Sequence, residues 1–235
     1  ICFHHLYLPF PNLDALQPNM KFYARHGIRG IFDQGDGRGE IKELRNYLLA
    51  KCMWDPDTDA RAVRDEFLEG YYGPAAPLLG EYQELIHKKT RDDNIHIYIW
   101  TQPTEAYLTP EILSRAEELF DEAERRGAGQ PELIERIEIA RLSLQYVKLS
   151  GATGDDLSAT FKKFKAVVDR ENRGSESNQG ELSYAGENKT MAEWLAEKGA
   201  MCARIEFDAG DHARGIYDFE SALSISPKNL SVSRQ

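Results

Sequence analysis

The sequence has few cysteines, no excess of positive charge and no long apolar run. Its three cysteines, Cys2, Cys52 and Cys202, are odd in number and far apart. They lack the spacing of metal ligands, so we expect buried, reduced thiols. Lys and Arg number 29 against 39 Asp and Glu, which gives a formal net charge of −10. This balance argues against a nucleic-acid partner and against an anionic membrane surface.

Two further absences concern targeting. No apolar run approaches the roughly 20 residues that a membrane-spanning helix needs. No basic segment followed by an apolar one opens the chain, so no signal peptide is recognised. The opening ICFHHLYLPF looks like the middle of a strand, and we expect the chain to be a piece of a longer protein. These features predict a soluble protein, and whether the parent is exported stays open.

Strand and helix signals alternate at the start of the chain. Residues 1–8 look like a strand, and the prolines of PFPNLD end it. A helix then begins at Asn12 or Asp14 and ends near Arg25. Ile28–Phe32 form the next predicted strand. The pattern predicts one parallel β-α-β unit, and therefore an α/β fold at this end.

Helical periodicity dominates the rest of the chain. The helix over 131–150 is apolar on nearly every side, so it is expected to be the most buried. Residues 172–189 are polar and rich in glycine, which favours a flexible linker. Helices are predicted over 41–54, from Thr58 or Asp59 to Gly70, over 75–89, from Thr109 to Gly127, over 131–150 and over 157–168.

The stretch DQGDGRGE, residues 33–40, follows the second predicted strand. Ligands of parallel α/β folds lie at the carboxyl ends of the strands, where Asp33, Gln34 and Asp36 are expected. Carboxylate and amide groups there suit the hydroxyls of a saccharide. A simpler alternative is that Asp33 caps the following helix or neutralises Arg38.

Two other interpretations of this stretch fail on spacing. An EF-hand loop needs Gly at position 6 and Glu at position 12, and neither Asp33 nor Asp36 as position 1 provides them. An irregular cation site stays open. A phosphate loop needs Lys followed by Ser or Thr, which is absent here.

Residues of the first predicted strand are further candidates for the saccharide site. His5 and Tyr7 lie on the same face of a strand, because side chains alternate. His5 is a candidate hydrogen-bond donor and Tyr7 a candidate stacking surface for a sugar ring, with packing in the core as the alternative for Tyr7. No acid or further histidine lies near this strand at the spacing of metal ligands, so we predict no metal site. We also predict no cofactor.

Several long motifs, occurring in order, carry a resemblance to a known family. They are the YLPFPNLD turn, the strand ending in acid-Gln-Gly, the LRNYLLAKCMWDPD helix and the FLEGYYGPAAP segment, followed by EAYLTPEILSRAEELFDEAE and KTMAEWLAE. Over about residues 1–197 the chain resembles a bacterial family of barrel proteins catalogued as a domain of unknown function. That family looks related to the α-glucuronidases of glycoside hydrolase family 67.

The resemblance implies that residues 1–54 are the last two β/α units of a (β/α)8 barrel and that a helical region over 55–171 follows. Asp33, Gln34 and Asp36 would lie at the mouth of the last strand. Glycosidases use two carboxylates roughly 5–9.5 Å apart, and two acids on one loop do not supply that pair. Catalytic residues are therefore unknown and expected upstream of Ile1, and this piece alone is expected to be inactive.

The tail carries a second resemblance. Residues 196–229 resemble one tetratricopeptide repeat, with Ala203, Gly210 and Pro227 at positions that suit its helix-turn-helix pattern. A single repeat cannot bury both its faces. The alternative for residues 190–235 is a plain helical hairpin.

Two functions follow from these patterns. In the first, the chain is the carboxyl-terminal portion of a carbohydrate-active, glycoside-hydrolase-like protein and contributes part of a saccharide pocket. In the second, it is a non-catalytic helical scaffold that binds a protein partner through its tail. Paired acids on strands upstream of Ile1 would distinguish the first function from the second.

Overall fold

A computed structural model of the chain describes residues 2, 5, 7–33, 40–151, 157–173 and 191–208. The chain divides into two compact units. The first unit contains residues 9–98 and 104–144, and the second contains residues 2–8, 99–103 and those after Leu144. We describe each unit by itself.

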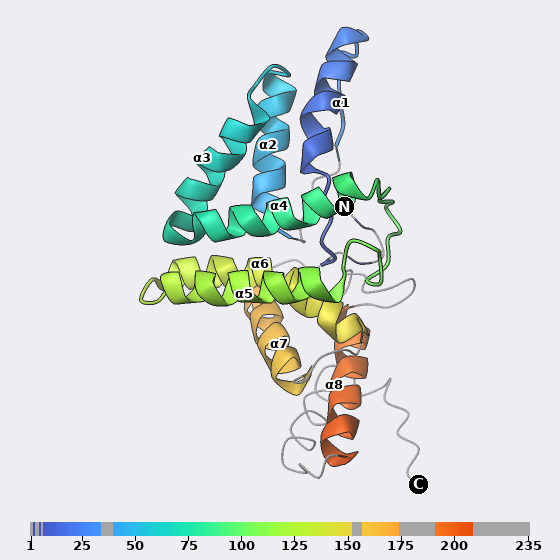
Figure 1. Cartoon of the computed structure of the whole chain (residues 1–235), viewed down its shortest axis with the longest axis vertical. Coiled ribbons are helices and arrows are strands. Elements are labelled where there is room, and N and C mark those ends of the chain that lie inside the picture. The colour runs from blue at the N-terminus through green and yellow to red at the C-terminus, as the bar shows by residue number, and fades with distance from the viewer. Residues whose placement is uncertain are drawn as a thin grey trace. The chain divides into compact units, whose positions relative to one another are not determined.

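All regular structure in the described residues is helical (Figure 1). The first unit holds α1 to α5 and the larger part of α6, which continues past Leu144 into the second unit together with α7 and α8. The bounds are α1 (Leu13–Arg25), α2 (Lys42–Trp54), α3 (Ala60–Tyr72), the short 3-10 helix η1 (Gly73–Ala75), α4 (Ala76–Asp92), α5 (Pro110–Arg126), α6 (Pro131–Gly151), α7 (Leu157–Arg173) and α8 (Met191–Asp208).

Local sequence signals set several of these helix ends. The Asp59 carboxylate accepts hydrogen bonds from the first free N–H groups of α3, and the Thr109 hydroxyl does the same for α5, whose first residue is Pro110. After α1 the chain turns at Gly27, whose φ of 73° lies in the left-handed region that glycine adopts without steric cost. The predicted helix starts at Asp59 and Thr109 are confirmed.

The core of the first unit lies where α4 meets the other helices. Figure 1 shows α1, α2 and α3 with α4 lying across their lower ends, while α5 runs alongside α4 on its other side. The apolar face of α2, predicted from its spacing, is buried in this core. The fully buried residues of the core of the first unit include Leu44, Leu48, Cys52, Tyr72, Leu79, Tyr82, Ile86, Phe120 and Ile137.

A buried arginine joins α5 to α6 within the first unit. The side chain of Arg141, on α6, is only 7% exposed and pairs with Glu117, Asp121 and Glu124 of α5. Nη2 lies 2.8 Å from Asp121 Oδ1, and Nη1 lies 2.8 Å from Glu124 Oε1. The three acids recur at i, i+4 and i+7, so one helix face presents them all. This acidic face of α5 is therefore a packing surface and not merely a solvated one.

The prediction that residues 131–150 form the most buried helix is confirmed for the described residues. Every residue of α6 from Ala140 to Val147 is buried, which no amphipathic helix could achieve. In the second unit, α7 and α8 pack together, with Phe161, Phe164 and Val168 of α7 buried. The three cysteines are free and buried, as expected.

The prediction of an α/β fold with barrel units over residues 1–54 is wrong. The described part of that range contains α1 and α2 and no β-strand. Residues 28–33 carry a strand-like sequence, but a strand forms only when its backbone pairs with a neighbour. The described backbone from Arg29 to Asp33 makes no hydrogen bond. Near the start, Leu8 N–H donates to His5 C=O at 2.8 Å, which closes a turn.

The remaining boundaries lie partly outside the described residues. Of the predicted linker, 172–189, only Asn172 and Arg173 are described, and they end α7. Of the tail over 190–235, α8 is described up to Asp208. The second half of the repeat-like stretch therefore lies outside the described residues.

Candidate functional site

The predicted saccharide residues belong to different units. Asp33 is an exposed residue of the first unit, at the end of the irregular segment that follows α1. Gln34 and Asp36 lie outside the described residues. His5 and Tyr7 belong to the second unit. Contact of any of them with a saccharide stays a prediction.

His5 is buried and both of its ring nitrogens are engaged. It is 7% exposed, with Nδ1 2.7 Å from the Tyr146 hydroxyl and Nε2 3.0 Å from Gln102 Oε1. Gln102 Nε2 donates to the carbonyl of Trp100, which fixes the orientation of the amide. Because Oε1 can only accept, His5 donates from Nε2 and accepts the Tyr146 hydroxyl proton at Nδ1. This bonding gives His5 a structural role in the second unit.

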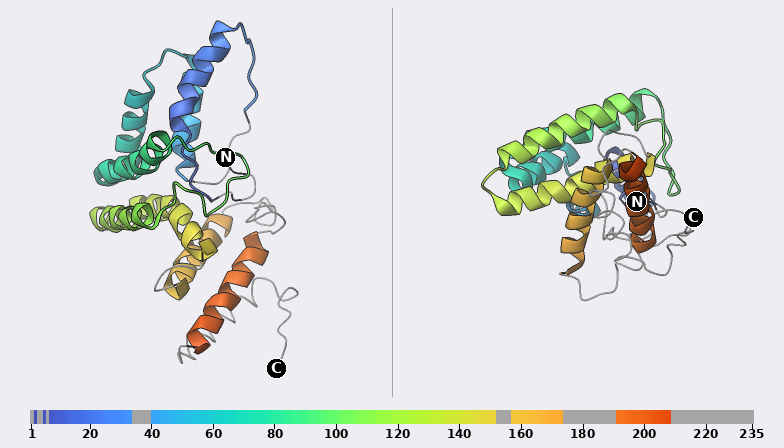
Figure 2. Two further views of the ribbon diagram at one scale, coloured as in Figure 1. Left: turned by 45° about the vertical axis from the view of Figure 1, so that its right-hand side comes forward. Right: turned by 90° about the horizontal axis from the view of Figure 1, so that it is seen from below.

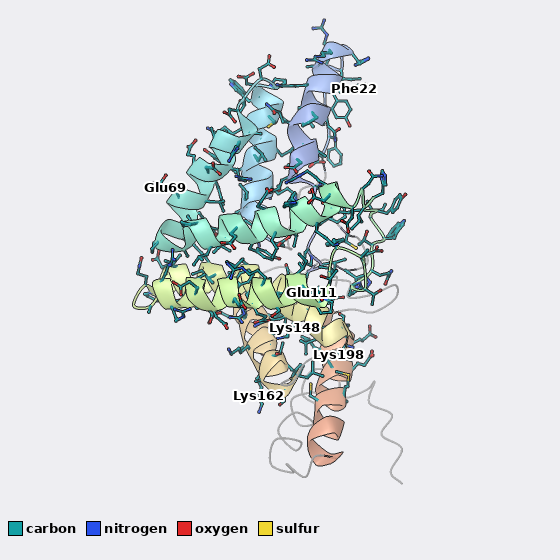
Figure 3. All side chains as sticks on the ribbon, viewed as in Figure 1. Phe22, Glu69, Glu111, Lys148, Lys162 and Lys198 are labelled. Atoms are coloured by element: carbon teal, nitrogen blue, oxygen red, sulfur yellow. The ribbon has the colours of Figure 1, made fainter. Side chains whose placement is uncertain are left out.

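Tyr7 lies in an aromatic cluster with residues of α6, α7 and α8. Its ring, 5% exposed, meets Phe164 edge-on at 5.5 Å, and Tyr146 stacks on Trp194 at 4.8 Å. Lys198, labelled on α8 in Figure 3, places its ammonium 5.8 Å from the centre of the Trp194 ring. Burial raises the pKa of Tyr146 well above its ordinary value. These contacts favour the core-packing alternative for Tyr7.

The first unit carries a group of exposed apolar side chains, which we call the apolar strip. Phe32 and Trp54 are 93% and 92% exposed. A group of large apolar side chains exposed to water often marks a binding surface. Phe22 projects outward from α1 in Figure 3. The strip comprises Phe22, Ile28, Ile31, Phe32, Met53 and Trp54.

A shallow hollow lies within the apolar strip. It has a volume of about 250 Å³ and brings Ile28 and Ile31 next to Met53, beside Met20 and Tyr23. Figure 2 shows the chain leaving the tip of α1 and running back beside that helix. The sequence pattern predicted a strand over residues 28–32. It did not predict that their apolar side chains would be exposed.

Basic side chains border the strip. Arg25 ends α1 and Arg29 lines the hollow, and neither forms an ion pair with the described residues. Lys21 pairs with Asp57 at 3.4 Å. The strip therefore combines apolar surface with two guanidinium groups that no acid of the described residues neutralises.

A larger cleft lies between α1, α3 and α4 of the first unit. Its volume is about 630 Å³, which is within the usual range for small-molecule sites. Apolar side chains form part of the lining, and the rest is polar or charged. The lining comprises Leu13, Asp14, Gln17, Pro18, Leu48, Asp59, Ala60, Arg61, Arg64, Gln83, Glu84, His87 and Arg91.

His87 holds the wall of the cleft in place. Its Nε2 accepts a hydrogen bond from Leu13 N–H at 3.1 Å, at the start of α1, and its Nδ1 donates to Gln83 C=O at 2.7 Å. Burial lowers the pKa of His87, so the imidazole is neutral at pH 7 and can act as this acceptor. No feature of the sequence distinguished His87 from an ordinary surface histidine.

A buried carboxyl group lies behind the cleft. Glu40 is almost fully buried, and burial raises its pKa, while nearby Tyr82, Arg45 and Gln83 favour the ionised form. Neither Glu40 Oε1 nor Gln83 Nε2 has a partner at hydrogen-bond geometry, although the two groups are close enough to interact. Gln83, which is 3% exposed, is one of the lining residues of the cleft, and its side chain lies near the Glu40 carboxyl group.

The part of the chain that is described contains neither a group of metal ligands nor a membrane-spanning helix. Its histidine, cysteine and acidic side chains include no group of three or more placed to hold a metal ion. None of its helices combines the length and apolar character needed to cross a bilayer.

Comparison with known proteins gives one match. Residues 1–84 are similar to a family described as a domain of unknown function (DUF4838). The match confirms a resemblance to such a family, over a shorter range than residues 1–197. No curated protein and no solved structure matches the chain. The family description names no activity, so function has to be argued from the structure.

Proposed function

We propose that this chain is a non-catalytic helical binding module that docks an extended segment of another polypeptide. The observation that carries the proposal is the exposed segment 28–33 at the centre of the apolar strip. Its Phe32 side chain is 93% exposed, and the backbone groups from Arg29 to Asp33 make no hydrogen bond with the described residues.

The unpaired backbone favours a strand as the partner. A stretch of chain with open N–H and C=O groups pairs with another extended chain, which gains one hydrogen bond after another along its length. A helix satisfies its own backbone groups and would leave those of residues 29–33 unmet. The side chains of a paired strand would also cover Phe32 and the hollow beside Met53.

The exposed side chains supply the affinity. Removing one large apolar side chain from water is worth about 1.5–3 kcal/mol, so Phe32 and Trp54 can act as anchors. Neither Arg25 nor Arg29 has an acidic partner within the described part of the chain. The expected partner is therefore an extended segment in which apolar residues alternate with acidic ones.

A synthetic peptide tests the proposal. The probe is a blocked hexapeptide that alternates valine and glutamate, and its binding to the chain is followed by fluorescence anisotropy. Phe32→Ser should weaken binding about tenfold, because the side chain would no longer bury its area. Tyr98→Ser, which removes another exposed aromatic ring of the first unit, is the matched control and should leave binding unchanged.

A second peptide separates strand pairing from simple apolar contact. Methylation of alternate backbone nitrogens removes the donors but keeps every side chain. Strand pairing predicts that the methylated peptide loses binding. Equal affinity of the two peptides, or equal loss in the Phe32 and Tyr98 variants, would show that residues 28–33 do not dock a strand.

A saccharide ligand is the second candidate, and the exposed carboxylate of Asp33 favours it. Asp33 has no partner among the described residues and can accept hydrogen bonds from sugar hydroxyls. The resemblance to glycoside-hydrolase-like proteins supports the same ligand class. Titration with glucose, xylose and glucuronate tests it: Asp33→Ala should cost about 1–3 kcal/mol of binding, whereas Glu69→Ala, on the exposed face of α3, should cost none.

The tail offers another surface for a protein partner in this proposal. Its support is the resemblance of residues 196–229 to one tetratricopeptide repeat, of which α8 contributes the described beginning. A chain shortened after residue 190 should retain the peptide binding of the apolar strip. Loss of that binding would assign the partner site to the tail instead.

A further inference from the structure

We propose that the cleft between α1, α3 and α4 binds a small organic anion, with Arg61 and Arg64 holding its carboxylate or phosphate group. This site is separate from the apolar strip and does not rest on strand docking. Its lining residues come mainly from α1, α3 and α4 of the first unit, which are labelled in Figure 1.

The acids of the cleft are already engaged by protein groups. Asp14 and Glu84 both pair with Arg91 at 2.5 Å. Asp59 accepts hydrogen bonds from the backbone N–H groups of Arg61 and Ala62, at 3.0 and 3.1 Å. Each of the three acids therefore has an oxygen engaged by a protein donor, and the lining contains three acids and three arginines.

Two arginines of the cleft have guanidinium donors that are not used by the described residues. The Arg61 side chain forms no ion pair with the described residues. Arg64 bonds Oδ1 of Asp65, its exposed neighbour, at 3.0 Å from Nε and 2.9 Å from Nη2, so Nη1 stays available. Both arginines lie in the first turns of α3 at a spacing of i and i+3, which places them on one face. The amino end of α3 adds a partial positive charge there.

The rest of the lining suits the body of such a ligand. Leu13, Pro18 and Leu48 provide an apolar surface for the rest of the ligand. An oxyanion attached to an apolar body therefore fits both the charge and the lining.

The test uses two simple anions. Inorganic phosphate and benzoate are titrated separately at constant ionic strength, and the backbone amide NMR signals of Arg61 and Ala62 are followed. We expect saturable shifts with at least one anion, and the tighter of the two identifies the charged group as phosphate or carboxylate. The absence of saturation with both anions would overturn the proposal.

Variants show whether the cleft is responsible. Arg61→Gln should weaken binding of the preferred anion about tenfold, and Arg64→Gln should do the same. Arg125→Gln removes one positive charge from α5 of the same unit and should change binding less than twofold. Equal weakening by Arg125→Gln and Arg61→Gln would show that the anion senses only overall charge and that no site exists.

Discussion

Two groups of arginines and acids on the first unit differ in how completely their charges are matched. Around Arg141, three carboxylates from α5 surround one buried guanidinium. In the cleft, by contrast, the acids are engaged by Arg91 and by the end of α3, and Arg61 is left over. The first arrangement holds two helices together. The second leaves Arg61 without an ion pair among the described residues.

The difference shows how a structural ion cluster can be distinguished from a binding site when no ligand is present. Residue type does not separate them, because both are built from Arg, Asp and Glu. Burial and pairing do: a buried arginine that pairs with several carboxylates is costly to remove, whereas an exposed arginine contributes little to folding. Substitutions of buried and exposed charged residues test this distinction.

Removal of the Arg141 side chain should give the largest loss of stability. Arg141→Ala leaves the carboxylates of Glu117 and Glu124, each partly buried, without a cation and opens space between α5 and α6. We expect the free energy of unfolding to fall by about 3 kcal/mol, measured by urea denaturation. Arg141→Met, which keeps the apolar stem, should lose less than the alanine variant. A loss below about 1 kcal/mol for Arg141→Ala would contradict the structural role.

Glu40→Gln should stabilise the chain at neutral pH. Burial raises the pKa of Glu40 above its ordinary value of 4.5, so its contribution to stability is greatest below pH 4.5 and is lost as the pH rises through the folded-state pKa. Glutamine stays neutral and avoids that loss. Urea denaturation at pH 7 and at pH 4 should show a gain only at pH 7, and Glu69→Gln on exposed α3 should show none at either. A gain of equal size at both pH values would exclude ionisation as its cause.

His87 should make stability depend on pH in the opposite direction. Because burial lowers its pKa below 6.5, the unfolded chain takes up a proton near pH 6.5 while the folded chain does not. Stability should be fully present above pH 6.5 and fall as the pH decreases toward the folded-state pKa. His87→Gln should reduce this fall, whereas replacement of the exposed His26 should keep it. Parallel pH profiles of the His87 variant and the parent would refute the assignment.

Arg61→Gln should have the smallest effect on stability. An exposed side chain without an ion pair contributes within about 0.5 kcal/mol, so the thermal midpoint should barely change. The same substitution should weaken anion binding about tenfold, which separates binding from folding. A stability loss as large as that of Arg141→Ala would place Arg61 among the structural arginines.

Features set by neighbouring residues could be predicted from the sequence. The start of α5 at Thr109 and Pro110 and the cap of α3 at Asp59 depend on contacts within one helical turn. The buried face of α2 followed from the spacing of Leu44, Leu48 and Cys52. The burial of α6 followed from apolar residues on nearly every side.

The predictions that failed depended on distant partners. The run Ile28–Phe32 has the composition of a strand, but a strand also needs a neighbouring strand to pair with. The composition of the run does not indicate whether such a neighbour is present. The cleft arises where α1 meets α3 and α4, so its lining has no linear motif. The spacing of Glu117, Asp121 and Glu124 was a usable signal of a facing cation, since three acids on one helix face repel one another unless paired. The predicted saccharide role of Asp33 stays a prediction.

The stacking of Trp194 on Tyr146 has an optical consequence. Of the three tryptophans, Trp194 is buried in the second unit, whereas Trp54 in the first unit is fully open to water. Trp194 should therefore emit at shorter wavelength and resist iodide quenching, whereas Trp54 should be quenched readily. Replacing Trp54 by phenylalanine leaves emission from the second unit alone, with Trp100 half exposed. The chain thus carries its own fluorescent reporters, Trp54 in the first unit and Trp100 and Trp194 in the second, with no added label.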